Sequence, residues 1–213
     1  MSLEGPLISW VGWDVRGGKA AESDAAESFT RSAPDGSGPD THYELMAVAG
    51  RGFRPPRYLS TALLAEEDQT DPHDETGSGH ESLRRTWSLV YRRIVETTPA
   101  QTTPFGIYLL GVNPPAGATD EELGIFNDFY TDVHLPEVAE RRHALRAVRY
   151  ELVREVQPPY QGAPRYLAVY EMDEAAASNR RHVGPKYSSG PDVWQRHTTP
   201  WRLWFRQLVP GAG

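Results

Sequence analysis

The chain contains no cysteine, and this absence removes several kinds of chemistry at once. Disulfide bonds, zinc–thiolate centres, iron–sulfur clusters and thiolate nucleophiles all require cysteine. No apolar run approaches the roughly 18 residues of a membrane-spanning helix, and no charged start followed by an apolar stretch marks a secretory signal. We therefore expect a soluble, cytoplasmic protein that does not act at a membrane.

Positive charge is also scarce. The sequence has 22 Lys and Arg residues against 29 Asp and Glu residues, a formal net charge of −7. Binding to a nucleic-acid backbone needs a basic surface, so the composition argues against a nucleic-acid partner. Hydrophobic residues make up 38% of the chain and include six Trp and ten Tyr, which is enough for a packed core. A chain of 213 residues can hold one domain or two small ones.

The clearest local pattern is an amphipathic helix that begins near Thr119. Thr119 and Glu122 have the spacing of a capping box. Apolar residues then recur at intervals of three and four, which predicts a buried stripe. The stripe consists of Leu123, Phe126, Tyr130 and Val133, widened by Ile125 and Phe129. Pro136 disfavours helical geometry at Leu135, so we expect the helix to end or kink there, with His134 in its last turn.

The end of this segment resembles a known superfamily. Tyr130 to Ala139 follow the pattern aromatic-x-x-x-His-Leu-Pro-x-x-Ala. This pattern resembles the dimeric α/β-barrel superfamily, particularly its EthD-like members. The resemblance covers residues 104–208 and implies a ferredoxin-like βαββ unit whose sheet pairs with a second sheet to close a barrel. The superfamily includes monooxygenases, isomerases, cyclases, haem enzymes and proteins without an assigned reaction.

Strand patterns recur along both halves of the chain. Alternating or β-branched and aromatic runs bounded by turn residues predict strands. These runs are residues 7–14, 43–48, 58–64, 106–113, 144–156, 165–172 and 201–208. Helices are expected over 19–32, over 81–97 and from 174 onward. The helix over 81–97 rests on the spacing of Leu83, Trp87, Val90, Tyr91 and Ile94.

A short repeat supports a duplicated architecture. Pro56-Arg57-Tyr58-Leu59 recurs as Pro164-Arg165-Tyr166-Leu167, and the same offset aligns the strands over 43–48 and 151–156. We interpret residues 1–103 as a degenerate βαββ(α) repeat and residues 104–213 as an EthD-like βαββ(αβ) repeat. The expected fold is α+β, with two ferredoxin-like repeats whose antiparallel sheets form a dimeric-α/β-barrel-type fold within one chain. The alternative is that two chains pair as a homodimer to cover the apolar second face of the sheet.

His134 is the leading candidate for chemistry. A neutral imidazole at a barrel mouth can act as a general acid or base, and Tyr130 and Asp132 are close enough in sequence to assist it. The alternative is that His134 caps the carbonyl groups at the end of its helix. The helix expected in the first half contains no histidine, so a single site in the second half is predicted.

Aromatic side chains on the predicted strands are candidates to line a pocket inside the barrel for a flat, apolar ligand. The proposed substrate-binding residues are Tyr108, Tyr150, Tyr166, Trp204 and Arg149. Arg149, and also Arg202, could anchor a carboxylate there. For each aromatic residue, the alternative is packing in an ordinary core.

The remaining histidines give weaker patterns. His73 and His80 lie in an acidic loop, but their spacing matches no metal-ligand pattern, so no metal site is predicted. His182 and His197 flank a segment rich in Gly and Pro that could act as a lid.

The sequence thus leaves three functional hypotheses. The first is an isomerase, cyclase or lyase that transfers protons without a cofactor, acting on a small hydrophobic or aromatic molecule. The second is a non-catalytic ligand-binding or structural barrel, and the third is a monooxygenase, with or without haem.

Overall fold

The computed structural model describes residues 6–16, 29, 41–49, 54–64, 82–97, 102–179 and 187–208. Eight strands form a closed barrel in the order β1–β3–β2–β8–β5–β7–β6–β4, and the recorded neighbouring pairs are antiparallel. The strands are β1 Leu7–Val15, β2 Thr41–Val48, β3 Tyr58–Leu64, β4 Leu83–Glu96, β5 Gly106–Asn113, β6 Arg146–Gln157, β7 Tyr166–Met172 and β8 Thr198–Leu208. The fold is therefore α+β with few helices.

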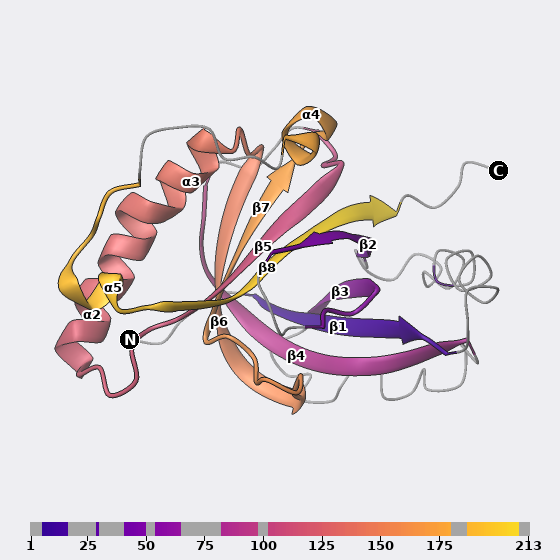
Figure 1. Cartoon of the computed structure of the whole chain (residues 1–213), viewed down its shortest axis with the longest axis horizontal. Helices are drawn as coiled ribbons and strands as arrows, with labels where there is room; N and C mark the ends of the chain where they lie inside the picture. Colours follow the sequence, from indigo (N-terminus) through magenta and orange to yellow (C-terminus); the bar gives the residue numbers. More distant parts are fainter. Residues whose placement is uncertain are drawn as a thin grey trace.

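The helices whose bounds the structure describes pack against the outer face of the sheet formed by β5 to β8. They are α2 Asp120–Phe129, the π-helix η1 Tyr130–His134, α3 Leu135–Arg141, α4 Glu174–Ser178 and α5 Asp192–Gln195. Figure 1 shows α2 and α3 running as one long helix along the side of the barrel away from β1 and β3. Among the described residues, no helix is long and apolar enough to cross a membrane.

Among the described residues, two large hydrophobic cores and one small cluster, made of Phe29, Tyr58 and Leu83, result from this arrangement. One large core fills the barrel interior and includes Trp10, Leu59, Leu109 and Tyr150. The other large core lies between the helices and the outer face of β5, β6, β7 and β8. Because the barrel interior is packed with side chains, a ligand site is more naturally sought in the outer layer, where helices meet the sheet.

The seven predicted strands are confirmed, with ends that differ by a few residues. The helix predicted over 81–97 is wrong, because these residues form β4. β4 pairs with β1 on one side and β6 on the other, and its centre from Trp87 to Tyr91 is buried on both faces. A strand buried on both faces reads as a continuous apolar run, which periodicity alone does not distinguish from a buried helix.

Of the two outcomes expected for the long helix at Leu135, an end or a kink, the end is wrong. The capping box at Thr119 is present, but the chain continues past His134 into α3. Pro136 lacks an N–H and its ring would clash with the carbonyl four residues earlier in a regular α-helix. The chain instead widens into η1, where the amide of Leu135 donates to the carbonyl of Tyr130, five residues back.

The π-helix changes which side chains face the sheet. Phe126 and Tyr130 are fully buried, as the stripe predicted, but Val133 is 36% exposed and Ile125 is 45% exposed. The extra residue in the π-turn moves the buried face from Val133 to His134 and Leu135, both of which are buried. The π-turn therefore turns His134 toward the protein interior.

Some of the predicted segments lie partly or wholly outside the described residues. Of the helix predicted over 19–32, only Phe29 is described, and it is helical and buried. The acidic loop with His73 and His80 lies outside the described residues, as does His182. The helical region expected from residue 174 is confirmed as α4, whereas α5 was not predicted.

The two halves of the barrel show matching geometry. Within the closed order, β4–β1–β3–β2 has the same sequence of neighbours as β8–β5–β7–β6. Gly12 lies opposite Leu59 and Trp87, and in the second half Gly111 lies opposite Leu167 and Trp201. The match holds for the residues paired with each glycine on both adjacent strands. The similarity between the two halves therefore extends over whole strands.

The short sequence repeat has a structural counterpart. Arg57 forms an ion pair with Glu44 at 2.7 Å, and Arg165 forms one with Glu151 at 3.2 Å. In each half the backbone carbonyl of the arginine accepts from the residue after the glutamate, at 2.9 Å and 2.8 Å. The repeated Pro-Arg-Tyr-Leu sequence therefore opens β3 and β7 with the same local contacts.

Candidate functional site

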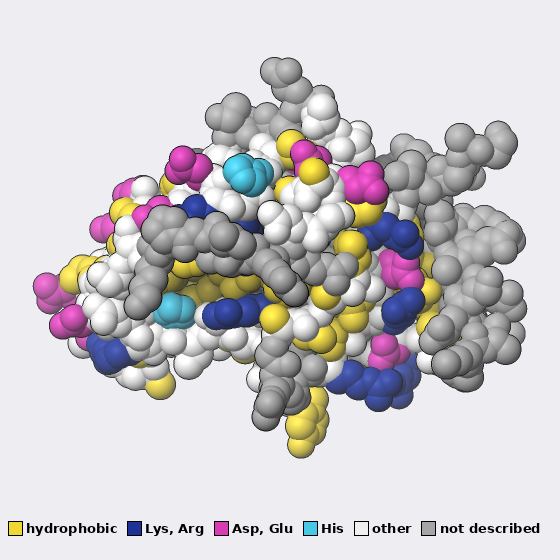
Figure 2. Space-filling model, turned by 45° about the horizontal axis from the view of Figure 1, so that its top comes forward, with side chains coloured by type: hydrophobic (Ala, Val, Ile, Leu, Met, Phe, Trp, Pro, Cys, Tyr) yellow, Lys and Arg dark blue, Asp and Glu magenta, His cyan; other side chains and the backbone are white. Residues whose placement is uncertain are grey.

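A pocket of about 220 Å³ lies between the helices and the outer face of the sheet. Its lining residues are Tyr108, Leu110, Val112, His134, Val138, Arg142, Tyr187, Trp194, His197, Thr199 and Arg202. Figure 2 shows a hollowed surface with hydrophobic side chains in its floor and a histidine and basic side chains beside it. The sequence predicted a pocket inside the barrel, whereas this one lies outside it, above β5 and β8.

A larger pocket, of about 480 Å³, lies elsewhere and is lined by Arg84, Trp87, Tyr160 and neighbouring residues. Its described lining includes no histidine, and much of its charge is already paired: Arg85 donates to Gln157 at 3.1 Å and Arg84 lies 3.9 Å from Asp14. We take the smaller pocket as the candidate site because it holds a buried titratable side chain with an unpaired ring nitrogen.

His134 is that side chain. It is 8% exposed, and its Nδ1 has no hydrogen-bond partner among the described residues. Aromatic rings surround it, with ring centres at 4.5 Å for Trp194, 5.3 Å for Tyr187 and 5.7 Å for Tyr130. Burial, and next the nearby His197, lower the pKa of His134 from 6.5 to about 4. The imidazole is therefore neutral near pH 7 and keeps a lone pair available.

The alternative reading of His134 as a helix cap is wrong. The helix does not end at this residue, which has helical backbone angles and makes no side-chain capping bond. Its burial therefore needs an explanation other than capping.

The two residues expected to assist His134 lie in different surroundings. Tyr130 is fully buried beneath the helix, and burial raises the pKa of its hydroxyl, which has no partner among the described residues. Its ring packs against the His134 ring, but it does not line the pocket. Asp132 is exposed on the opposite side of the helix and is not brought to the pocket.

Arg149 is buried, but under the helix rather than in the pocket. Its guanidinium donates to the Thr131 hydroxyl at 2.8 Å and to the Asn127 side chain at 2.5 Å. It also lies over the rings of Tyr130 and Tyr166, at 4.3 Å and 4.4 Å. Burial lowers the pKa of Arg149. These contacts tie the helix to β6, so the side chain is already engaged.

The predicted aromatic residues divide between the two cores. Tyr108 lines the pocket, and Trp204 stacks on it with ring centres 4.5 Å apart. Tyr166 stacks on Phe126 beneath the helix. Tyr150 faces the barrel interior, where it contacts Trp10. Of the proposed substrate-binding residues, only Tyr108 borders the pocket directly.

Sequence reasoning missed several lining residues. Arg142 follows α3. No helix was predicted over these residues, because Pro136 was expected to end or kink the preceding helix. Trp194 belongs to the short α5, which shows no periodic pattern. Arg202 and His197 were noticed, and the structure brings both to the pocket, although not inside the barrel. The eight-residue spacing of His134 and Arg142, which puts them near one helix face, is the signal that could have found Arg142.

The polar lining has a definite electrostatic character. The Nδ1–H of His197 donates to the carbonyl of Trp194 at 2.5 Å, which leaves its other nitrogen as an acceptor in the neutral ring. Burial raises the pKa of Tyr108, and the charges of Arg142 and Arg202 oppose that shift. Both cations therefore act at the same hydroxyl. Among the described residues, no group of three His, Asp or Glu side chains could hold a metal ion.

Comparison with solved structures identifies the fold. A heme-binding protein from Thermus thermophilus aligns with a TM-score of 0.53 and 13% identity, covering 98% of this chain and 93% of that one. A protein named as a candidate chlorite dismutase aligns with a TM-score of 0.56 and 11% identity, covering 97% and 96%. Both belong to the dimeric α/β-barrel superfamily.

The chain shares with these proteins an α+β fold with a closed barrel of eight antiparallel strands, which is consistent with the expected dimeric α/β barrel. No protein-family model and no curated protein sequence matches the chain. At these identities the likeness concerns the fold alone. Only the residues of the pocket indicate what chemistry this chain could perform.

Proposed function

We propose that the chain is a small-molecule enzyme that transfers protons without a cofactor, in the manner of an isomerase, cyclase or lyase. The pocket beside His134 would bind a hydrophobic or aromatic substrate, and His134 would take a proton from it. The observation that carries the proposal is a buried, neutral imidazole that lines an aromatic pocket and whose Nδ1 has no partner among the described residues. A buried polar atom left unpaired costs free energy, which is a common property of functional groups.

The environment favours a base that acts on an activated carbon acid. With a pKa of about 4, His134 is a weak base in the empty pocket, so the proton it removes must be acidic, as it is next to a carbonyl group. Removing that proton leaves a negative charge on the substrate. Arg142, held over the Tyr108 ring at 4.2 Å, is placed to stabilise such a charge. The new charge would in turn raise the pKa of His134.

Tyr130 supports this proposal as a positioning residue. Its ring packs against His134 and is itself fixed by Arg149. We do not assign a role to Asp132, because its side chain is exposed outside the pocket.

We also propose the finer classification suggested by the sequence, an EthD-like tandem duplication with repeats over 1–103 and 104–213. The matching strand order supports it, as do the paired contacts of Gly12 and Gly111. In this arrangement one chain supplies both sheets of its barrel. A second copy of the chain would then not be needed to close it.

The residues present do not fit haem, the ligand named for one structural neighbour. The pocket, at about 220 Å³, is smaller than the roughly 300–1,000 Å³ typical of sites for drug-sized ligands, and a porphyrin is at least that large. An imidazole that ligates a metal usually donates its other N–H to a fixed acceptor, and among the described residues His134 Nδ1 has none.

Deuterium exchange tests the proposal. The probe is phenylacetone, which has one ring and acidic protons next to its carbonyl group, and its deuteration in D₂O is followed by NMR with the purified full-length chain. We expect the chain to accelerate exchange and His134→Gln to reduce the acceleration by about 10²- to 10⁴-fold. The matched control is His143→Asn, an exposed histidine at φ 52°, a conformation that asparagine tolerates.

Two outcomes would contradict the proposal. Equal exchange by the His134→Gln variant and the wild-type chain would exclude His134 as the base. Binding of phenylacetone without any accelerated exchange would instead favour the second hypothesis, a non-catalytic ligand-binding protein.

A further inference from the structure

The pocket lining carries positive charge without a matching acid. Arg142 and Arg202 both line it, and none of the described lining residues is Asp or Glu. This is unexpected for a chain whose formal net charge is −7. A ligand that brought its own negative charge would complete the site.

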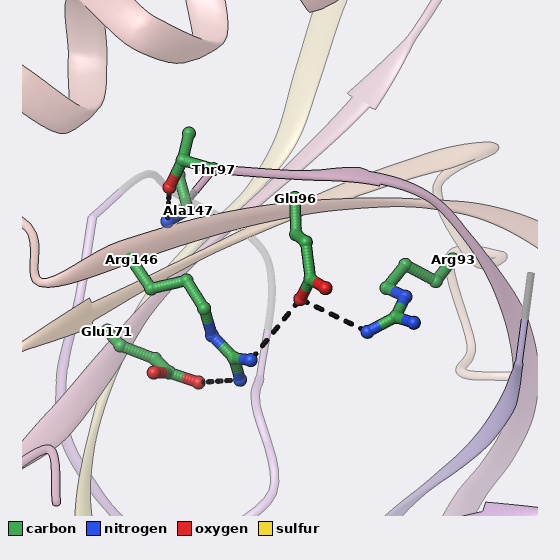
Figure 3. Close-up of polar contacts among 6 residues, drawn as sticks. All are labelled: Arg93, Glu96, Thr97, Arg146, Ala147 and Glu171. Carbon is green, nitrogen blue, oxygen red and sulfur yellow. Dashed lines mark hydrogen bonds and ion pairs between the residues drawn. The ribbon is translucent and has the colours of Figure 1, made fainter. Parts of the chain in front are cut away.

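Several arginines elsewhere in the fold form ion pairs with carboxylates. Figure 3 shows Arg146 between Glu96 and Glu171, at 3.3 Å and 2.5 Å. On β8 itself, Arg206 forms an ion pair with Glu44 at 2.6 Å. Among the described residues, neither Arg142 nor Arg202 has a carboxylate partner. Arg149 also lacks a carboxylate partner, but of the described arginines only Arg142 and Arg202 line this pocket.

Glu137 is the acid whose charge acts on His134, and its carboxylate is already hydrogen-bonded. It accepts hydrogen bonds from the backbone N–H of Ser188 at 3.1 Å and from the Ser188 hydroxyl. These bonds lower the pKa of Glu137, so it stays ionised while bound to this loop. It does not line the pocket and does not neutralise the two arginines.

Arg142 is held in position rather than free to move. Its guanidinium lies 4.2 Å from the centre of the Tyr108 ring and 5.8 Å from that of Trp204. Stacking uses one face of the guanidinium and leaves N–H groups at its edge, and its Nε has no hydrogen-bond partner among the described residues. A planar donor fixed in this way suits the two oxygens of a carboxylate.

The rest of the lining describes the other end of the ligand. Leu110, Val112 and Val138 supply an apolar surface, and Tyr187 and Trp194 supply aromatic walls. A pocket of about 220 Å³ accommodates one ring better than several. The apolar part of the ligand is therefore compact and flat.

We infer that the natural ligand of this pocket is a monocyclic aromatic carboxylate, held by Arg142 and Arg202 through its carboxylate and by the aromatic walls through its ring. The inference rests on the proposed function, because it concerns the same pocket. It adds the charge and size of the substrate, and it explains why the described lining holds two cations and no acid.

Benzoate and benzamide test the inference, because they have nearly the same shape and differ in charge. Binding to the full-length chain is measured by NMR titration at pH 7. We expect benzoate to bind at least about 10-fold more tightly than benzamide, since hydrogen bonds to charged groups are the stronger kind. Arg142→Met and Arg202→Gln should each weaken benzoate binding by about 10- to 100-fold and leave benzamide binding nearly unchanged.

The control is Arg206→Gln, four residues along β8 from Arg202 and outside the pocket. Arg202 is exposed, so its variant keeps the test valid even if Arg142→Met fails to fold. Equal binding of benzoate and benzamide would overturn the inference but leave the proposed function standing. Charge-dependent benzoate binding without deuterium exchange would support the inference and contradict the proposed function. Binding of neither probe would overturn the inference.

Discussion

The guanidinium carbon of Arg149 lies 4.3 Å from the centre of the Tyr130 ring, one helical turn before His134. The same guanidinium lies 4.4 Å from the Tyr166 ring on β7. A buried cation between two aromatic rings thus joins the helix to the sheet on which the pocket is built. Three of the residues singled out from the sequence meet here, as a support beneath the pocket.

Removal of this support should destabilise the protein. Arg149→Ala loses the hydrogen bonds to Asn127 and Thr131 and leaves a cavity, so we expect the free energy of unfolding to fall by about 3 kcal/mol. Urea denaturation measures the change. Arg165→Ala, which removes a half-exposed ion pair with Glu151, should cost less than about 1 kcal/mol. Equal losses of unfolding free energy in the two variants would argue against a role of Arg149 in joining the helix to the sheet.

The stability of the chain should depend on pH through His134. Its pKa is 6.5 when unfolded and about 4 when folded, so between these values the unfolded state binds more protons. Stability is therefore complete above pH 6.5 and is lost as the pH falls toward 4, by about 3 kcal/mol in total. Urea denaturation at several pH values measures the slope, and His134→Gln should remove most of it. An NMR titration that gives His134 a pKa near 6.5 would contradict the expectation.

Two glycines should respond in opposite ways to alanine. A Cβ at Gly106 would collide with the backbone carbonyl oxygen of Phe205 on β8, and a paired strand cannot move away easily. Gly106→Ala should therefore cost about 2 kcal/mol or more. Gly124, in α2, has nothing within 4 Å of that position, so Gly124→Ala should stabilise the chain by about 1 kcal/mol. Thermal unfolding of both variants provides the comparison.

The position of the ligand, outside the barrel rather than within it, can be tested with two tyrosines. Tyr108 lines the outer pocket and Tyr150 lies in the packed interior. Tyr108→Leu should weaken benzoate binding by about 10-fold, because it removes the ring on which Arg142 stacks. Tyr150→Phe should leave the affinity unchanged. Unchanged binding to Tyr108→Leu together with weaker binding to Tyr150→Phe would place the ligand inside the barrel instead.

Features that depend on residues close in sequence were predicted, whereas features that depend on residues remote in sequence were not. The capping box and the stripe through Phe126 and Tyr130 depend on residues three and four apart, and both were predicted correctly. β4 was predicted as a helix because its identity depends on β1 and β6, which are remote in sequence. The pocket was expected inside the barrel because the sequence does not say which face of a strand points inward.

The sequence by itself determined seven of the eight strands, the start of the long helix, the lack of cysteine chemistry and the choice of His134 as a candidate. Each of these depends on residue type or on neighbours within one turn. Only the tertiary structure decided that the helix continues past Pro136 through a π-turn, and so that Arg142 reaches the same pocket as His134. The helix continues because its packing against the sheet supplies contacts that offset the local preference of a proline to end a helix.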